Sequence, residues 1–284
     1  MGTEGIPGVV PGVQAPSWRD FERVGWQERV HAYHQFFAPV CRPAAGTVLD
    51  AVGAGPGTRL LDACCGPGYL AGAAAERGCG AVGIDIAAPM IRLATQLHPC
   101  ARFQVGDAAQ LPYAEAAYDM VVCNIGIHHV TDPAQVVAEF TRVMTSSGVL
   151  ALTVWDDGRS QLGVVKDAVN AVSPAVPRGL PSAPQRPDYL SQEEVRELLH
   201  PAGLRLRHFI PITVDQRYAD AQTLWDGWLA TAIRTGPLLG AQTAAVRGAA
   251  RAALDGLIAH NVDSSGAVSL QAVLMLIIAD GRAR

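Results

Sequence analysis

The spacing of apolar side chains changes along this chain, and each spacing predicts a different kind of element. Between residues 17 and 55, Trp26, Val30 and Tyr33 recur every three or four positions, which predicts a helix with one apolar face. A second, shorter helix is expected to follow Pro43, because proline is tolerated best in the first turn of a helix.

Short apolar runs then alternate with helical patterns as far as residue 155. This alternation predicts a parallel sheet with helices on both faces, the doubly wound α/β class. Asp132 and Pro133 are expected to begin a helix that carries Val143 and Met144 on its inner face. The predicted strands are Arg59–Ala63, Ala81–Ile86, Arg102–Val105, Tyr118–Cys123 and Val149–Trp155.

The second half of the chain has a looser pattern. Ser191 and Glu194 form a capping box that begins a helix, Leu204–Val214 is expected to be a sixth strand, and Val268–Ala279 the last strand. The predicted organisation is a mobile tail at 1–16, an N-terminal helical lid at 17–55, a core at 56–215 and 266–284, and a helical insertion at 216–265 that forms a substrate lid.

Composition narrows the class of protein. The chain has 284 residues, 49% of them hydrophobic, and a formal net charge of −4 without a basic block, which predicts a folded protein with no nucleic-acid partner. The apolar stretch 272–279 is too short to cross a bilayer and no secretory pattern is present, so a cytoplasmic protein with no membrane partner is expected. The six cysteines lack C-x-x-C spacing, so no metal site is expected.

A glycine-containing turn follows the first predicted strand. Gly66 and Gly68 let the backbone turn tightly and approach a ligand, and Asp85 ends the next strand, where a carboxylate can bind ribose hydroxyls. The same spacing fits a dinucleotide fingerprint, but the charge of Asp62 would repel a pyrophosphate and would anchor a cationic amine. The alternative is that both glycines serve only the packing of strand against helix.

Two further segments follow predicted strands at the edge where such sheets bind ligands. Gly106, Asp107 and Ala108 come after the third strand, where the carboxylate suits an adenine amino group, and Asn124 ends the fourth strand. The alternative for Asp107 is that it caps a helix. Cys64, beside the glycine turn, is equally compatible with packing and with lining a pocket.

Five segments between residues 59 and 156 resemble those of class I S-adenosylmethionine-dependent methyltransferases, in the same order. They are most similar to the small-molecule group typified by ubiquinone and menaquinone C-methyltransferases. They read LLDACCGPG, AVGIDIAAPMIRLA, VGDAAQLPY, YDMVVCNIGIHHVTDP and AEFTRVMTSSGVLALTVWD. The resemblance implies a Rossmann-like sheet whose last strand is antiparallel to the fifth, and S-adenosylmethionine as cofactor. Cys64 and Cys65 depart from the family pattern and make the turn bulkier.

The resemblance also implies which residues hold the cofactor. Asp85 is implied to bind the ribose, Ile86 and Asp107 the adenine, and Asn124 the methionine part, while Tyr33 is expected to reach the cofactor from the N-terminal helix. The full expected set is Tyr33, Asp62, Ala63, Cys64, Gly66, Gly68, Asp85, Ile86, Met90, Gly106, Asp107, Ala108 and Asn124.

The acceptor is expected to be a small, partly apolar metabolite, methylated on oxygen, nitrogen or carbon, as in natural-product biosynthesis. Enzymes that methylate nucleobase amino groups usually carry an Asn/Asp-Pro-Pro-aromatic run after the fourth strand, and the run beginning at Asn124 differs from it. Tyr218, Trp225 and Trp228 are expected to line the acceptor site from the helical insertion, with ordinary core packing as the alternative.

His128 and His129 are the candidates for a general base. An imidazole with an ordinary pKa of about 6.5 accepts a proton near neutral pH. Consecutive side chains diverge, so at most one is expected to face the acceptor, with His129 slightly preferred. The alternative is that both only brace the loop before Asp132.

Two other classes of function stay open at this point. An NAD-dependent oxidoreductase is disfavoured by Asp62 and by the run Gly106-Asp107-Ala108. A non-catalytic S-adenosylmethionine-binding protein is compatible with every motif, because the same contacts would hold the cofactor in both cases.

Overall fold

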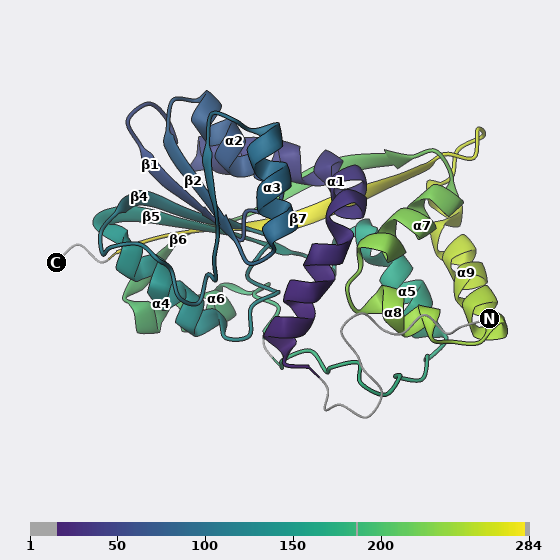
Figure 1. Cartoon of the computed structure of the whole chain (residues 1–284). Helices are drawn as coiled ribbons and strands as arrows, with labels where there is room; N and C mark the ends of the chain where they lie inside the picture. Colours follow the sequence, from purple (N-terminus) through teal and green to yellow (C-terminus); the bar gives the residue numbers. More distant parts are fainter. Residues whose placement is uncertain (1–15, 186, 282–284) are drawn as a thin grey trace. The chain divides into compact units, whose positions relative to one another are not determined.

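The computed structural model describes residues 16–185 and 187–281, so the predicted tail at 1–16 lies outside the described residues except for Pro16. The strands form a seven-stranded sheet with the order β3-β2-β1-β4-β5-β7-β6 (Figure 1). They are β1 Arg59–Ala63, β2 Gly80–Asp85, β3 Arg102–Val105, β4 Tyr118–Asn124, β5 Met144–Trp155, β6 Leu204–Tyr218 and β7 Val268–Gly281.

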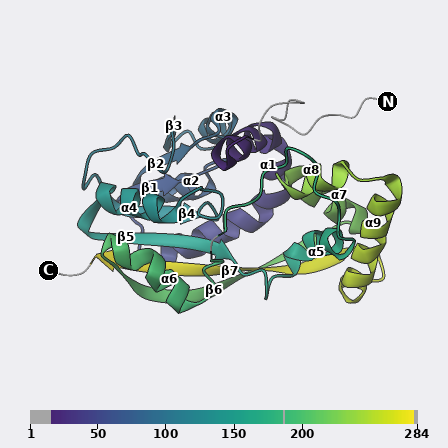
Figure 2. The ribbon, with the colours of Figure 1, turned by 90° about the horizontal axis from the view of Figure 1, so that it is seen from below.

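The strand directions confirm the expected fold class. Strands β1 to β5 pair in parallel, and β7 pairs antiparallel with β5 (Figure 1 and Figure 2). In the antiparallel pair, Leu152 lies opposite Ile277. The chain proceeds from β1 outward to β2 and β3, and then returns to place β4 on the other side of β1. The order of the strands therefore reverses between β1 and β4, which is the point where open α/β sheets bind ligands.

Helices cover both faces of this sheet. Right-handed connections that run in opposite directions from β1 place α2 and α3 on one face and α4 and α6 on the other (Figure 1). The helices are α1 Trp18–Ala51, α2 Tyr69–Glu76, α3 Ala88–Leu97, α4 Pro133–Val143, α5 Val164–Ala171, α6 Gln192–Leu199, α7 Ala221–Thr231, α8 Thr235–Gly240 and α9 Ala244–Ile258.

Two helix starts form as the local sequence predicts. The Asp132 carboxylate accepts a hydrogen bond from the backbone N–H of Gln135 at 3.1 Å, with Pro133 in the first turn of α4. Ser191 and Glu194 form the predicted capping box at the start of α6. None of the helices within the described ranges is long and apolar enough to cross a membrane.

The prediction of a separate helix after Pro43 is wrong, because α1 is one helix from Trp18 to Ala51. The side chains of Val48 and Leu49 are fully buried, and the guanidinium of Arg42 lies 5.0 Å from the centre of the Tyr69 ring. Packing on α2 therefore keeps the chain helical at Pro43, although proline removes one backbone hydrogen bond.

Two predicted strand boundaries are wrong by more than two residues. Met144 was expected on the inner face of a helix, but its backbone is extended (φ −87°, ψ 142°) and it begins β5 beside Tyr118. Strand β6 continues beyond Val214 to Tyr218. In both cases pairing with a strand that is distant in sequence determines the boundary, which a local pattern does not report.

The contacts divide the chain into two compact units. Unit 1 comprises residues 1–39, 157–184 and 215–272, and unit 2 comprises residues 40–156, 185–214 and 273–284. Helix α1 and strands β6 and β7 contribute residues to both units. Unit 2 contains β1 to β5 and a core in which Phe140, Leu152 and Ile127 are fully buried. The boundaries of the lid and of the insertion remain predictions.

Candidate functional site

The carboxyl ends of four parallel strands of unit 2 carry almost all of the predicted cofactor residues. The turn after β1 holds Gly66, the turn after β2 holds Ile86, the loop after β3 holds Asp107, and β4 ends at Asn124. Strand β1 pairs directly with both β2 and β4. The topology therefore brings these residues to one edge of the sheet, at the reversal of strand order.

The turn after β1 is a left-handed turn that glycine makes possible. Gly66 has φ 51° and Gly68 has φ 79°, both in the region that L side chains rarely adopt. A Cβ on Gly68 would lie 2.6 Å from the Phe103 ring and 2.9 Å from Ala94 Cβ. Gly68 is thus required for its conformation and for packing, while Gly66 presents its backbone N–H to Asp85 at 2.9 Å.

Asp62 is a buried carboxyl group at the end of β1. One carboxyl oxygen, Oδ2, accepts a hydrogen bond from the backbone N–H of Ala71 at 3.0 Å, while Oδ1 has no hydrogen-bond partner among the described residues. Burial and the nearby charge of Asp85 raise the pKa of Asp62 to about 7. A buried acceptor of this kind suits a cationic group, which would favour its ionised form.

Asp85 connects the turns that follow β1 and β2. Its carboxylate accepts hydrogen bonds from the backbone N–H of Gly66 at 2.9 Å and of Ala87 at 2.8 Å. Removal from water raises the pKa of Asp85, whereas these two hydrogen bonds and the charge of His129 act in the opposite direction. The carboxylate thus holds the glycine turn in place.

The loop after β3 is ordered by its own backbone. Gly106 donates its N–H to the Asp85 carbonyl at 2.9 Å, and Asp107 Oδ1 accepts from Ala109 N–H at 2.9 Å. Residues 106–117 contain no helix, so the alternative in which Asp107 caps one is wrong. Its carboxylate instead makes a local turn. Ala108 is 6% exposed and belongs to the core of unit 2.

Three remaining members of the expected set differ in exposure. Ala63 is fully buried and Met90 is 2% exposed, so both lie in the core beneath the turns, while Ile86 is half-buried. Ala63 and Met90 can therefore shape the floor of a site more readily than they can contact a ligand over a large area.

Asn124 is held by a residue that the sequence patterns do not single out. Thr153, on β5, donates its hydroxyl hydrogen to Asn124 Oδ1 at 2.6 Å, and the Thr153 hydroxyl oxygen accepts from the N–H of Ile125 at 2.9 Å. Thr153 is fully buried, and its only trace in the sequence is one polar residue inside an apolar strand. It fixes the direction of the Asn124 side chain.

Cys64 and Cys123 bring two thiols together beside the turn. A Cβ on Gly126 would lie 2.5 Å from Cys64 Cβ and 2.7 Å from Cys123 Sγ, so the three residues are tightly packed. The hydrogen bond to Cys123 and removal from water raise the pKa of the Cys64 thiol well above its usual range. Both observations favour packing over nucleophilic chemistry at Cys64.

The two candidate bases have different neighbours. The His128 ring stacks on the Tyr189 ring, with centres 6.3 Å apart and planes 11° apart, and its Nε2 lies 3.4 Å from the Asp188 carbonyl oxygen. His129 instead acts electrostatically on Asp85. Tyr189 is buried with φ 58°, and no pattern in the proline-rich segment around it indicates this role.

The aromatic residues expected in the lid belong to unit 1. Tyr218 is buried and stacks on Phe36 at 5.3 Å, and Trp225 is 8% exposed with the Arg251 guanidinium 6.0 Å from its ring. Both are thus packed within unit 1, whereas Trp228 is only half-buried.

Tyr33 also belongs to unit 1. Its ring packs 5.3 Å from that of Trp26 and 5.4 Å from that of Phe37, measured between ring centres. Its contact with a cofactor remains a prediction. No group of three or more potential metal ligands occurs among residues 16–185 and 187–281.

Comparisons with known proteins find relatives of the region that contains these strands. Residues 61–152 match the family model of a methyltransferase domain. A demethylmenaquinone methyltransferase of Renibacterium salmoninarum is 35% identical over 105 residues, which are 37% of this chain and 44% of the relative. The matched region thus spans less than half of that relative.

Solved structures share the fold at low identity. A Haemonchus contortus phosphoethanolamine N-methyltransferase, in complex with S-adenosylhomocysteine, superposes with a TM-score of 0.56 at 17% identity, covering 96% of this chain and 62% of the other. The [4+2]-cyclase SpnF also has a TM-score of 0.56 at 17% identity, covering 96% of this chain and all of the other. The fold is therefore shared by proteins with different reactions.

Proposed function

We propose that this chain, whose residues 61–152 match the family model of a methyltransferase domain, is a class I S-adenosylmethionine-dependent methyltransferase that transfers a methyl group to a small-molecule acceptor. The observation that supports this most strongly is the pair of carboxyl groups around the glycine turn. Asp62 has a buried oxygen without a partner among the described residues, and Asp85 lies at the end of the neighbouring strand.

The residues present are chemically suited to S-adenosylmethionine. Asp62 would hold the cationic amino group and Asp85 the ribose hydroxyls, since both are charge-assisted interactions. Asp107 would accept a hydrogen bond from the adenine amino group, and the backbone at Gly66 leaves room for close approach of the methionine part. A pyrophosphate would meet the negative charge of Asp62, which disfavours NAD.

When bound, S-adenosylmethionine would supply a methyl group on a positively charged sulfur, and the neutral thioether S-adenosylhomocysteine would be the leaving group for in-line attack on the methyl carbon by the acceptor. The protein's own contribution is alignment and exclusion of water. Asn124, held by Thr153, orients the methionine side of the site.

The acceptor in this proposal is a small metabolite. The Renibacterium relative is, by its name, a methyltransferase of demethylmenaquinone, and the net charge of −4 disfavours nucleic acid. A cytoplasmic location and a place in natural-product biosynthesis belong to the same proposal. Comparing metabolites of cells with and without the protein identifies the acceptor by a product heavier by one methylene group.

Cofactor binding tests the proposal directly. By isothermal titration calorimetry, S-adenosylhomocysteine should bind to the purified protein and NAD should not. Asp85→Ala should weaken the binding of S-adenosylhomocysteine by about 1.5–3 kcal/mol, because the substitution removes charge-assisted hydrogen bonds to the ribose. Asp119→Ala is the matched control. Asp119 pairs with Arg59 at the amino ends of β1 and β4, away from the carboxyl ends that carry the proposed site. Unchanged affinity in Asp85→Ala would refute the site assignment.

His129 is our first candidate for a base, because its charge acts on Asp85 at the carboxyl edge of the sheet, whereas His128 stacks on Tyr189. If one histidine is the base, its Ala variant should lose roughly a hundredfold or more in turnover on the identified acceptor. The affinity for S-adenosylhomocysteine is measured in parallel. A loss of the base leaves this affinity unchanged, whereas an effect through Asp85 would lower it. Near-normal turnover in both His128→Ala and His129→Ala would show that neither histidine is the base. The protein would then act only by aligning the acceptor with the methyl group.

A non-catalytic cofactor-binding protein is the second candidate. The cyclase SpnF shares this fold, and a fold alone does not specify a reaction. S-adenosylhomocysteine binding without a methylated product in any comparison of metabolites would favour this candidate over the enzyme.

A further inference from the structure

We propose that Glu139 and Arg142 on α4 are positioning residues that hold the segment 107–113 in the conformation that receives the adenine end of the cofactor. This inference rests on the proposed function, because it assigns a purpose to the loop that carries Asp107. We refer to the two side chains as the Glu139–Arg142 pair. All of the residues concerned belong to unit 2.

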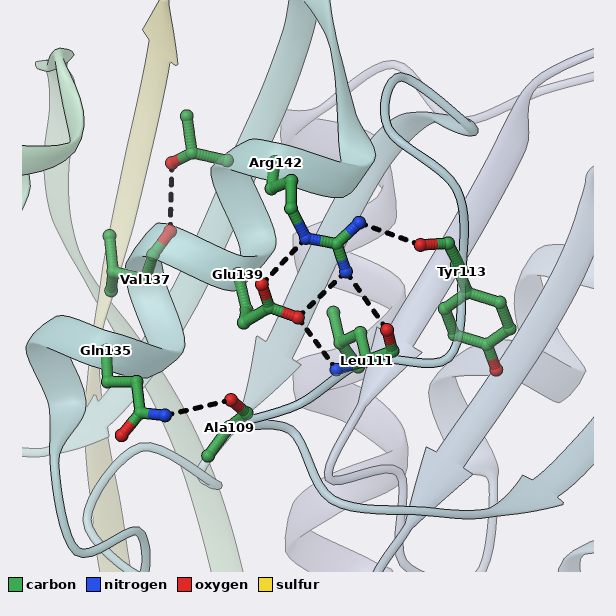
Figure 3. Close-up of polar contacts among 8 residues, drawn as sticks. Ala109, Leu111, Tyr113, Gln135, Val137, Glu139 and Arg142 are labelled. Carbon is green, nitrogen blue, oxygen red and sulfur yellow. Dashed lines mark hydrogen bonds and ion pairs between the residues drawn. The ribbon is translucent and has the colours of Figure 1, made fainter.

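Arg142 reaches from the last turn of α4 to two backbone carbonyls of the segment. Its two terminal nitrogens donate to the Tyr113 oxygen at 2.8 Å and to the Leu111 oxygen at 3.0 Å (Figure 3). Its own backbone oxygen accepts from the N–H of Ala116 at 3.1 Å. One residue of α4 thus holds the loop at three points.

Glu139 completes the arrangement one turn earlier in α4. Its Oε2 accepts a hydrogen bond from the backbone N–H of Leu111 at 2.8 Å, so both backbone polar groups of Leu111 are bound by the pair (Figure 3). Glu139 also accepts two hydrogen bonds from Arg142, at 2.7 and 2.8 Å. Two parallel charge-assisted hydrogen bonds fix the guanidinium plane, and a fixed plane aims the other donors at the loop.

The loop needs such a partner because it forms neither helix nor strand. Residues 106–117 make only turns and one isolated bridge, between Asp107 and Gln110, while Ala108 and Leu111 are buried. Buried backbone groups outside regular structure require other partners. The pair supplies to Leu111 what a neighbouring strand would supply, and Gln135 adds a hydrogen bond to the Ala109 carbonyl at 3.2 Å.

These contacts lie on either side of the residue that would read the adenine. Gly106 is tied to Asp85, and the Ala109–Tyr113 stretch is tied to α4, so Asp107 lies between two anchored points. The Asp107 carboxylate accepts a hydrogen bond from the N–H of Ala109, which belongs to the stretch that α4 holds. The Glu139–Arg142 pair and Gln135 fix the position of the residues after Asp107. The direction of the Asp107 carboxylate therefore depends on these α4 side chains.

The experiment compares Arg142→Lys and Glu139→Gln with the wild type. Arg142→Lys keeps the charge but cannot make the fork of parallel hydrogen bonds, and Glu139→Gln keeps the shape but removes the charge. Arg59→Lys is the matched control, because Arg59 forms a similar fork with Asp119 (3.0 and 2.6 Å) at the amino ends of β1 and β4. Circular dichroism and melting temperature establish that each variant is folded.

The first readout needs no cofactor. Hydrogen–deuterium exchange, read by mass spectrometry, should show the amides of segment 107–113 exchanging roughly ten times faster or more in both pair variants, as expected for the loss of one or two charge-assisted hydrogen bonds. The same segment should exchange at the wild-type rate in Arg59→Lys. Wild-type exchange in both pair variants would overturn the proposal.

The second readout separates positioning from general stability. Calorimetry compares S-adenosylhomocysteine with S-inosylhomocysteine, in which the adenine amino group is replaced by oxygen. The wild type should prefer the former, and the pair variants should lose most of that preference, whereas a purely structural role would leave the ratio unchanged. A wild-type ratio in both folded variants overturns the proposal. Failure of the wild type to bind S-adenosylhomocysteine overturns the proposed function instead, and with it the role toward adenine.

Discussion

At the scale of one residue, Asp62 shows how burial changes the ionisation of a carboxyl group. In an exposed position its carboxyl would ionise near pH 4, whereas here burial raises the pKa to about 7. Only one of its two oxygens has a hydrogen-bond partner among the described residues. The ionised form therefore has one buried oxygen without a hydrogen-bond partner among the described residues.

This predicts a pH dependence of stability in the absence of cofactor. Between about pH 4 and 7 the folded protein keeps a proton on Asp62 that the unfolded chain has released, so the contribution of this group to stability is lost as pH rises through about 7. The free energy of unfolding in urea should fall by on the order of 1–3 kcal/mol more in the wild type than in Asp62→Asn between pH 5 and pH 8. Asp85 remains in both proteins, so the difference isolates Asp62. Parallel pH profiles would contradict the assignment.

Three other residues at the same edge hold strained backbone. Cys64, Ile125 and Tyr189 have φ values of 56°, 62° and 58°, in the left-handed region that costs a side chain about 1–2 kcal/mol. Such strain persists only where surrounding contacts impose it, and it often accompanies a functional site. Here Cys64 follows β1, Ile125 follows β4, and Tyr189 stacks on His128.

At the scale of elements, the junction between β1 and α2 depends on close approach. Gly68 lies at the start of α2, against Phe103 of β3 and Ala94 of α3. Because the turn is close-packed on both partners, a single methyl group must displace a ring or a helix. The glycine therefore determines how strand and helices pack.

Gly68→Ala should destabilise the protein by about 2–4 kcal/mol, through both the left-handed backbone and the overlap with Phe103. Gly203→Ala is the matched control, since Gly203 has φ 74° but a Cβ at this position would meet no atom within 4 Å, and the change should cost only about 1 kcal/mol. Urea unfolding measures both. Equal losses would show that backbone conformation alone, and not packing, makes Gly68 necessary.

At the scale of the whole molecule, the two units divide the predicted roles. Asp62, Asp85, Asp107 and Asn124 belong to unit 2, and the aromatic residues of the predicted lid belong to unit 1. Within unit 1, the burial of Trp225 indicates a structural role, while the half-buried Trp228 keeps surface that an acceptor could cover. Cofactor binding and acceptor binding should therefore respond to different substitutions.

We expect Trp228→Ala to lower kcat/KM for the identified acceptor while leaving the affinity for S-adenosylhomocysteine unchanged. Trp225→Ala is the comparison, and it should lower the melting temperature, because it leaves a cavity and removes the Arg251 contact. Steady-state kinetics measure kcat/KM, calorimetry measures the affinity for S-adenosylhomocysteine, and thermal unfolding measures the melting temperature of each variant. Normal acceptor kinetics in Trp228→Ala would remove this residue from the lid.

The sequence by itself determined the parts of this protein that depend on near neighbours in the chain. The alternation of strands and helices, the caps at Asp132 and Ser191, and the glycine turn flanked by Asp62 and Asp85 all follow from local spacing and side-chain chemistry. The last strand antiparallel to β5 was expected only through family resemblance, because no local pattern encodes strand direction.

Tertiary structure alone decided the features that depend on residues distant in sequence. Met144 lies in a strand, where the sequence predicted a helix, because it pairs with Tyr118. Packing against α2 keeps α1 helical at Pro43. Thr153 beneath Asn124, and the Glu139–Arg142 pair around Leu111, join segments that lie far apart along the chain. Such contacts carry no periodic pattern, because each forms only after the sheet has brought its partners together.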